Sequence, residues 1–178
     1  MIRTDRALEI ERIAADLKRR YDTSDPYELA DCLKIMVDFD AHPGLLGFCF
    51  QLPGKTVIGL NSRADYYTRR CACAHELGHI VLGHLEDPEY LMGHASTLSN
   101  MTSRFEAEAN CLSAAFLTED EDALEAIETY LNSAMAAASL CVCPEIYRAK
   151  ILSLNARGYN FAVPEITGHK PWRDYVKD

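Results

Sequence analysis

Two histidines and a glutamate stand close together in the stretch Ala74-His75-Glu76-Leu77-Gly78-His79. On a helix, side chains four residues apart lie on one face, so His75 and His79 can reach a single zinc ion. Glu76 neighbours His79 on the helix surface and can face the ion without binding it. A carboxylate placed there can take a proton from a water molecule that zinc activates. The spacing therefore predicts metal-assisted hydrolysis, with His75 and His79 as ligands and Glu76 as general base.

A catalytic zinc ion needs a third protein ligand, and the next apolar-periodic segment offers two glutamates. Glu106 and Asn110 are four residues apart, so they share a helix face. Glu106 can then bind the metal while Asn110 accepts a hydrogen bond from a ligand imidazole. Glu108 points to another side of the same helix. Helical phase favours Glu106 as the third ligand and leaves Glu108 as the second candidate.

Two helices must position these residues, and the segment between them carries two further histidines. Apolar periodicity predicts helices over residues 67–82 and 103–117, with Gly83 ending the first. Residues 86–100 are predicted to be a loop. His84 falls out of phase with the ligand pair, and His94 lies in the loop. We expect both to be ordinary exposed histidines, although His94 could approach the cleft and stabilise an oxyanion.

The rest of the pattern predicts an α+β protein with a small antiparallel sheet and C-terminal helices. Helices are expected at residues 5–21, at 26–33 and, in short pieces, from about 119 to 154; strands are expected at 35–39, 45–52 and 56–60. The segment 56–61 leads towards the motif helix and is predicted to be an edge strand that pairs with a substrate. We divide the chain into a metallopeptidase domain (1–120), a helical appendage (121–157) and an irregular tail (158–178).

Composition indicates a cytoplasmic protein that neither spans membranes nor favours nucleic acid. The 178 residues carry a formal net charge of −9. This charge repels phosphates, so direct binding of nucleic acid is not expected. No apolar stretch approaches membrane-spanning length, and the charged N-terminal residues do not form a signal peptide. The seven cysteines are expected to be reduced thiols, and the two Cys-x-Cys pairs lack the usual spacing of zinc ligands.

With these motifs in order, residues 25–118 resemble the ImmA/IrrE family of zinc metallopeptidases. The resemblance rests on four blocks: Asp25-Pro26-Tyr27-Glu28-Leu29-Ala30, Gly59-Leu60-Asn61, Arg69-Arg70 before the histidine motif, and Glu106-Ala107-Glu108-Ala109-Asn110. It implies a compact zincin-like fold and zinc held by His75, His79 and a glutamate of the later helix. It also implies action on a DNA-binding repressor in a phage, mobile-element or stress-response switch. We expect that helix-turn-helix repressor to be a separate protein.

Two other functions stay open at the level of sequence. The segment 136–154 is predicted to form a helix, a tight turn and a second helix, on which Arg148 and Lys150 could meet phosphates. A partner-binding role for this segment is favoured over DNA contact because the chain is acidic. The chain could also be a zinc-containing binding module that sequesters a regulator without cleaving it.

Overall fold

The computed structural model describes residues 2–40, 45–95 and 102–166. Its helices are α1 (Thr4–Tyr21), α2 (Pro26–Cys32), α3 (Tyr66–Val81), α4 (Pro88–Ala95), α5 (Thr102–Leu117), α6 (Asp120–Thr129), α7 (Ser133–Ser139) and α8 (Pro144–Ala156), with a short 3-10 helix, η1, at His84–Glu86. The strands are β1 (Ile35–Asp40), β2 (Gly47–Leu52) and β3 (Lys55–Asn61). The predicted α+β class is confirmed. Among the described residues, no helix has the length and apolar character needed to cross a membrane.

The sheet has the order β1-β3-β2, and this arrangement corrects two predictions. β2 and β3 form the expected antiparallel hairpin, with Gly54 at a positive φ of 75° in its turn. β1 runs parallel to β3, so the sheet is mixed and not antiparallel. The segment 56–61 belongs to β3, which is hydrogen-bonded on both sides. It is the central strand, and the prediction that it is a substrate-binding edge is wrong.

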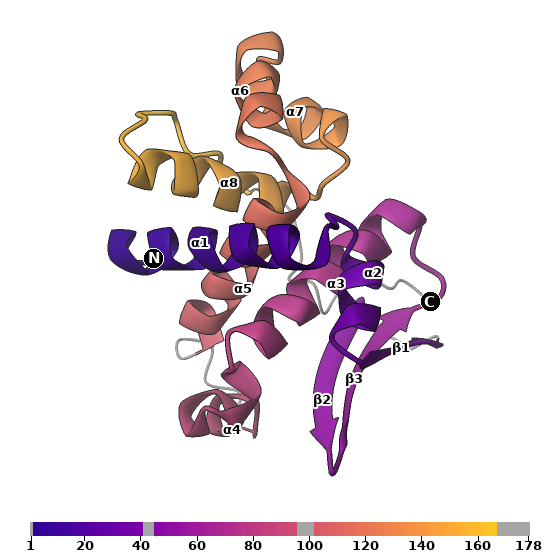
Figure 1. Cartoon of the computed structure of the whole chain (residues 1–178). Coiled ribbons are helices and arrows are strands. Elements are labelled where there is room, and N and C mark those ends of the chain that lie inside the picture. Colours follow the sequence, from indigo (N-terminus) through magenta and orange to yellow (C-terminus); the bar gives the residue numbers. More distant parts are fainter. Residues whose placement is uncertain (1, 41–44, 96–101, 167–178) are drawn as a thin grey trace.

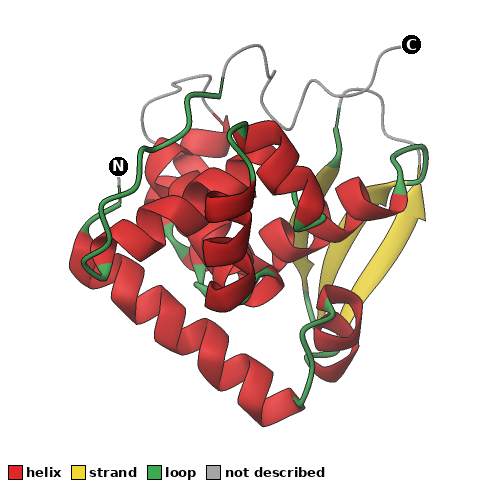
Figure 2. Cartoon of the chain, turned by 90° about the horizontal axis from the view of Figure 1, so that it is seen from above, coloured by secondary structure: helices red, strands yellow, loops and turns green. Residues whose placement is uncertain are grey.

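Helix α3 lies between the sheet and α5. One of its sides packs against β2 and β3, and another packs against α5. A core of Leu29, Ile35, Ile58, Leu60 and Leu77 joins the sheet to α2 and α3. Figure 2 shows the sheet at one side of the molecule, with the helices gathered beside it.

Helix α5 is the centre of the helical part. It contacts α3, α1 and α8, and α8 runs alongside α1 (Figure 1). The apolar face of α1 carries Ala7, Ile10 and Ala14, which recur at helical spacing and are buried. Because α5 is held on three sides, side chains on its first turns are presented to α3 from a fixed position.

The helix predictions agree with the structure to within about two residues, except between α3 and α5. There the expected loop 86–100 contains η1 and α4, while residues 96–100 lie outside the described residues. His94 lies within α4 and not in a loop, and its side chain is not among those described. Residues 157–166, at the start of the predicted irregular tail, contain no regular secondary structure.

Candidate metal centre

The chemistry-bearing residues of the motif lie in the middle of α3. Asp65 caps this helix by accepting a hydrogen bond from the Thr68 backbone N–H at 3.0 Å. The bonds from Thr68 also lower the pKa of Asp65. His75, Glu76 and His79 are all less than 10% exposed. Titratable side chains are rarely this buried unless they are paired or bind a ligand.

A close approach of two helices brings α5 to the histidines. A Cβ atom on Gly78 would lie 2.9 Å from the Cα and the carbonyl oxygen of Ala109, so only glycine fits there. Gly78 follows the first histidine by three residues, and Ala109 lies between Glu106 and Asn110 on α5. The absence of a side chain at Gly78 therefore lets these two α5 residues reach His75.

His75, His79 and Glu106 form a triangle of donor atoms. The two Nε2 atoms are 3.1 Å apart, and Glu106 places its oxygens 3.2 Å from Nε2 of His75 and 3.6 Å from Nε2 of His79. Ligand atoms held tetrahedrally at zinc distances lie about 3.4 Å from one another. The three side chains thus fit a zinc ion in both chemistry and spacing, and they are the group of potential ligands within the described residues. Glu108 is not part of this triangle.

The orientation of His75 is held from its other nitrogen. Nδ1 lies 2.9 Å from the side-chain oxygen of Asn110, which can only accept, so Nδ1 carries the proton and donates. Burial alone would lower the pKa of His75, but the hydrogen bond and charge of Glu106 outweigh it and raise the pKa to about 9. In the metal-free protein the His75 ring therefore carries a second proton and a positive charge at neutral pH.

The Glu76 side chain lies against strand β2. A Cβ atom on Gly47 would lie 3.3 Å from the Glu76 side chain, so a glycine here leaves room for the carboxylate. The Cys49 thiol, also on β2, hydrogen-bonds Glu76. Burial first, and then the nearby Glu76 carboxylate, raise the pKa of that thiol, which keeps it protonated as a donor. Sequence reasoning missed Cys49, because its closeness to Glu76 depends on how β2 packs on α3.

His84 is the largest departure from the predicted site. It was expected to be exposed, but it is 3% exposed and its Nδ1 lies 3.0 Å from Nδ1 of His79. Gly83, at a φ of 74°, ends α3 and turns the chain so that His84 folds back over His79. Burial lowers the pKa of His84 below its ordinary value, so the ring is neutral at neutral pH. Helical phase could not reveal this contact, because His84 lies beyond the helix end.

Glu108 is buried elsewhere and has a different partner. It is 6% exposed, and Arg6 of α1 bonds its Oε2 atom through two nitrogens, at 3.0 and 2.7 Å. The sequence pattern offered Glu106 and Glu108 as alternatives for the same place. The structure puts only Glu106 beside the histidine pair.

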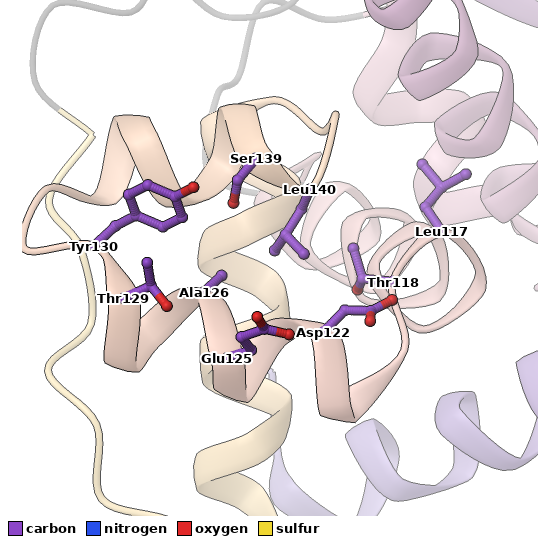
Figure 3. Close-up of a pocket in the computed structure, with 9 residues that line it drawn as sticks. All are labelled: Leu117, Thr118, Asp122, Glu125, Ala126, Thr129, Tyr130, Ser139 and Leu140. Carbon is purple, nitrogen blue, oxygen red and sulfur yellow. The ribbon is translucent and has the colours of Figure 1, made fainter.

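The cavities near the C-terminal helices differ in their relation to the site. One, of about 470 Å³ between α5 and α8, is lined in part by Glu106, Asn110, Arg148 and Leu152, so it adjoins the donor triangle. Another, of about 330 Å³ between α6 and α7, contains none of the site residues (Figure 3). Lys150, considered above as a phosphate contact, is 2% exposed and bonds the Thr118 carbonyl oxygen, so it does not face a ligand.

Comparison with known proteins adds two findings. The model of the IrrE N-terminal-like domain, peptidase family M78, matches residues 33–150. The chain is also 30% identical over 105 residues to a protein of Bacillus phage phi105 named "Uncharacterized immunity region protein 2". That similarity covers 58% of this chain and 65% of the phage protein, so the chain spans slightly less than two thirds of its relative.

Proposed function

The chain belongs to the ImmA/IrrE family, whose domain covers residues 33–150, and from this premise we propose that it is a zinc-dependent endopeptidase. The observation that carries the proposal is the triangle of His75, His79 and Glu106, with Glu76 beside it on α3. A zincin-like arrangement, in which one helix supplies two ligands and the base while a later helix supplies the third ligand, is consistent with this placement.

Each residue of the site has a separate task in the proposed reaction. His75, His79 and Glu106 hold the metal. Zinc bound there supplies Lewis acidity, which activates a water molecule and polarises the scissile carbonyl. Glu76 takes the proton of the attacking water and can pass it to the leaving amine. The hydrogen bond from the Cys49 thiol holds the Glu76 carboxylate against β2, where the absence of a side chain at Gly47 leaves room for it.

We place the substrate along β2. This strand pairs with β3 on one side, and no strand among the described residues pairs with its other side. Its residues Gly47 and Cys49 lie against the proposed base. An extended peptide that adds to this edge through main-chain hydrogen bonds would pass the catalytic carboxylate. The cavity beside Glu106, which Arg148 and Leu152 also line, can take a substrate side chain.

The proposed substrate is a separate helix-turn-helix repressor in the cytoplasm, and its cleavage would relieve repression. The phage relative is named for an immunity region, which is the setting in which such a switch operates. The net charge of −9 favours a protein substrate over direct contact with DNA.

The competing function is a zinc-containing module that sequesters the regulator without cleaving it. Glu76→Gln separates the two, because it removes the base while leaving the three metal ligands in place. We expect zinc content and partner binding to stay, and cleavage of the cognate repressor to fall by about 10²–10⁴-fold. The measurements are elemental analysis, pull-down of the repressor and mass spectrometry of the cleaved peptide. Equal relief of repression by wild type and Glu76→Gln would establish sequestration and refute the peptidase.

A further inference from the structure

Beginning with His79 and continuing on its Nδ1 side, three buried polar side chains form a row that ends at the partly exposed Arg6. His84 Nδ1 faces His79 Nδ1 at 3.0 Å, and His84 Nε2 faces Glu108 Oε2 at 3.4 Å. Arg6 closes the row by bonding the same oxygen of Glu108. The four residues come from α3, η1, α5 and α1, so the row is built by tertiary packing and not by one helix.

Aromatic packing fixes the ring at the centre of this row. The ring centroid of His84 lies 4.9 Å from that of Phe105 and 5.8 Å from that of Tyr90, and the Tyr90 ring also lies 5.1 Å from the ring of His79. Phe105 and Tyr90 are themselves buried. A ring enclosed in this way cannot rotate to exchange its two nitrogens without disturbing its neighbours.

The row determines where the protons lie. Glu108, paired with the Arg6 guanidinium, offers only acceptor oxygens, so His84 must donate from Nε2. A neutral imidazole has one donor and one acceptor, so His84 Nδ1 accepts. The hydrogen bond at 3.0 Å then requires His79 to donate from Nδ1. In that tautomer the lone pair of His79 Nε2 is directed towards His75 and Glu106, where a metal would bind.

We infer that His84 is a positioning residue that, anchored by Glu108 and Arg6, orients His79 and sets its tautomer for metal binding. The inference rests on the proposed zinc site and concerns how tightly that site binds, not whether the protein cleaves a substrate. It gives Glu108 a role different from the ligand role considered from the sequence. Asn110 serves His75 in the corresponding way, through Nδ1.

The first test reads the tautomer directly in metal-free protein. Nitrogen-15 spectra of the histidine rings should show His79 protonated at Nδ1 in the wild type. His84→Phe keeps a ring of similar size but has no acceptor, and we expect the His79 proton to move to Nε2. His84→Asn places a carbonyl oxygen close to the position of Nδ1 and should restore the wild-type tautomer. If His79 Nδ1 is unprotonated in the wild type, the inference is overturned.

The second test measures zinc affinity by competition with a chromophoric chelator. We expect a loss of about 10–100-fold in His84→Phe, with partial recovery in His84→Asn. Glu108→Gln, which can present either an oxygen or an amide N–H to His84, should lose affinity by about tenfold or less. Glu86→Gln makes the same change at an exposed residue of η1 and should leave affinity unchanged. Thermal unfolding of the metal-free variants shows whether each one folds.

The outcomes separate this inference from the proposed function. If the wild type binds zinc and neither His84→Phe nor Glu108→Gln binds it more weakly, the positioning role is refuted while the zinc site stands. If the wild type binds no zinc, the peptidase proposal fails, and the nitrogen-15 spectra still decide whether His84 sets the tautomer of His79. A folded Glu108→Gln with weakened zinc binding supports the inference even if His84→Phe does not fold.

Discussion

At the scale of single residues, each ligand histidine is held at both ring nitrogens. Nε2 of His75 and of His79 point at one another and at Glu106, while their Nδ1 atoms are engaged by Asn110 and His84. Three potential ligands this close together, two of them buried, have to share a cation. In the metal-free protein that cation is a proton, and in the proposed enzyme it is zinc.

This competition predicts that zinc binding weakens in acid. The hydrogen bond to Glu106 raises the pKa of His75 from 6.5 to about 9, so the metal must displace a proton at any pH below 9. Release of one proton lowers the affinity by about tenfold for each pH unit from pH 9 downwards. Chelator competition at a series of pH values measures this slope. An affinity that does not change between pH 7 and pH 9 would contradict the proton assignment at His75.

At the scale of the elements, the site depends on two close contacts of α3. One is with α5 at Gly78, and the other is with β2 at Gly47. Neither glycine is needed for its backbone conformation, since both have φ values open to other residues. At Gly78 a methyl group would meet the backbone of α5 and push that helix away, whereas at Gly47 it would crowd the Glu76 side chain itself.

Gly78→Ala should therefore damage both folding and metal binding. The added Cβ would lie 2.9 Å from the backbone of Ala109, so α5 has to move and carry Glu106 away from the histidines. We expect a loss of about 1–3 kcal/mol in the free energy of unfolding, together with weaker zinc binding. Urea unfolding and chelator competition measure the two effects. Helix propensity alone predicts the opposite sign, so increased stability would show that the close contact does not matter.

The open edge of β2 allows a test of the proposed substrate path. The Asn61 N–H donates to the Leu46 carbonyl oxygen at 2.9 Å, and the register of β2 with β3 then directs the N–H groups of Cys49 and Gln51 away from β3. Gln51→Pro removes one outward donor without breaking the hairpin. We expect weaker binding and slower cleavage of the repressor, with zinc content unchanged.

Phe50→Pro is the matched control for Gln51→Pro. The N–H of Phe50 faces β3, so its loss should destabilise the hairpin whether or not a substrate is present. If Gln51→Pro cleaves the repressor as fast as the wild type, the substrate does not pair with β2 at this position.

At the scale of the whole molecule, charged groups join the C-terminal helices to one another and to the end of α5. Asp120 at the start of α6 bonds Lys150 at 2.8 Å and also pairs with Arg157 beyond the end of α8. Lys150 is almost fully buried and also donates a hydrogen bond to the carbonyl oxygen of Thr118, the residue that follows α5. These contacts join α5, α6 and α8 at one point, and α8 in turn lines the cavity beside Glu106.

Asp120→Asn should destabilise the protein at neutral pH and not in acid. The hydrogen bond from Arg157, and then that from Lys150, hold the pKa of Asp120 well below 3.8. A carboxyl group whose pKa is lowered by folding stabilises the protein at pH values above its ordinary pKa. That stability is lost progressively as the pH falls below about 4. Because Asp120 is 34% exposed, solvent screening limits the decrease in the free energy of unfolding of Asp120→Asn to about 1–2 kcal/mol.

Urea unfolding of wild type and Asp120→Asn at pH 7 and at lower pH measures this difference. We expect the difference in the free energy of unfolding between the two proteins, which we call the gap, to narrow steadily below pH 4. Glu121→Gln, an exposed neighbour on α6, should show no gap at either pH. A gap that is the same at every pH would mean that the charge of Asp120 is not what stabilises this junction.

The sequence alone determined the parts of this protein that depend on neighbours along the chain. Helical spacing placed His75, Glu76 and His79 on one helix, and caps such as Asp25 and Gly83 marked where helices begin and end. The same phase argument favoured Glu106 over Glu108, because position on a helix face is a local property.

Only the tertiary structure decided which elements are neighbours in space. A strand pattern contains no signal for sheet order, so it could not show that β3 is central and β2 is the edge. Helical phase ends with the helix, so it could not show that His84 folds back over His79 or that Arg6 reaches Glu108 from the other end of the chain. These contacts join residues up to 102 positions apart. They form because buried polar groups must find partners once the apolar faces have packed.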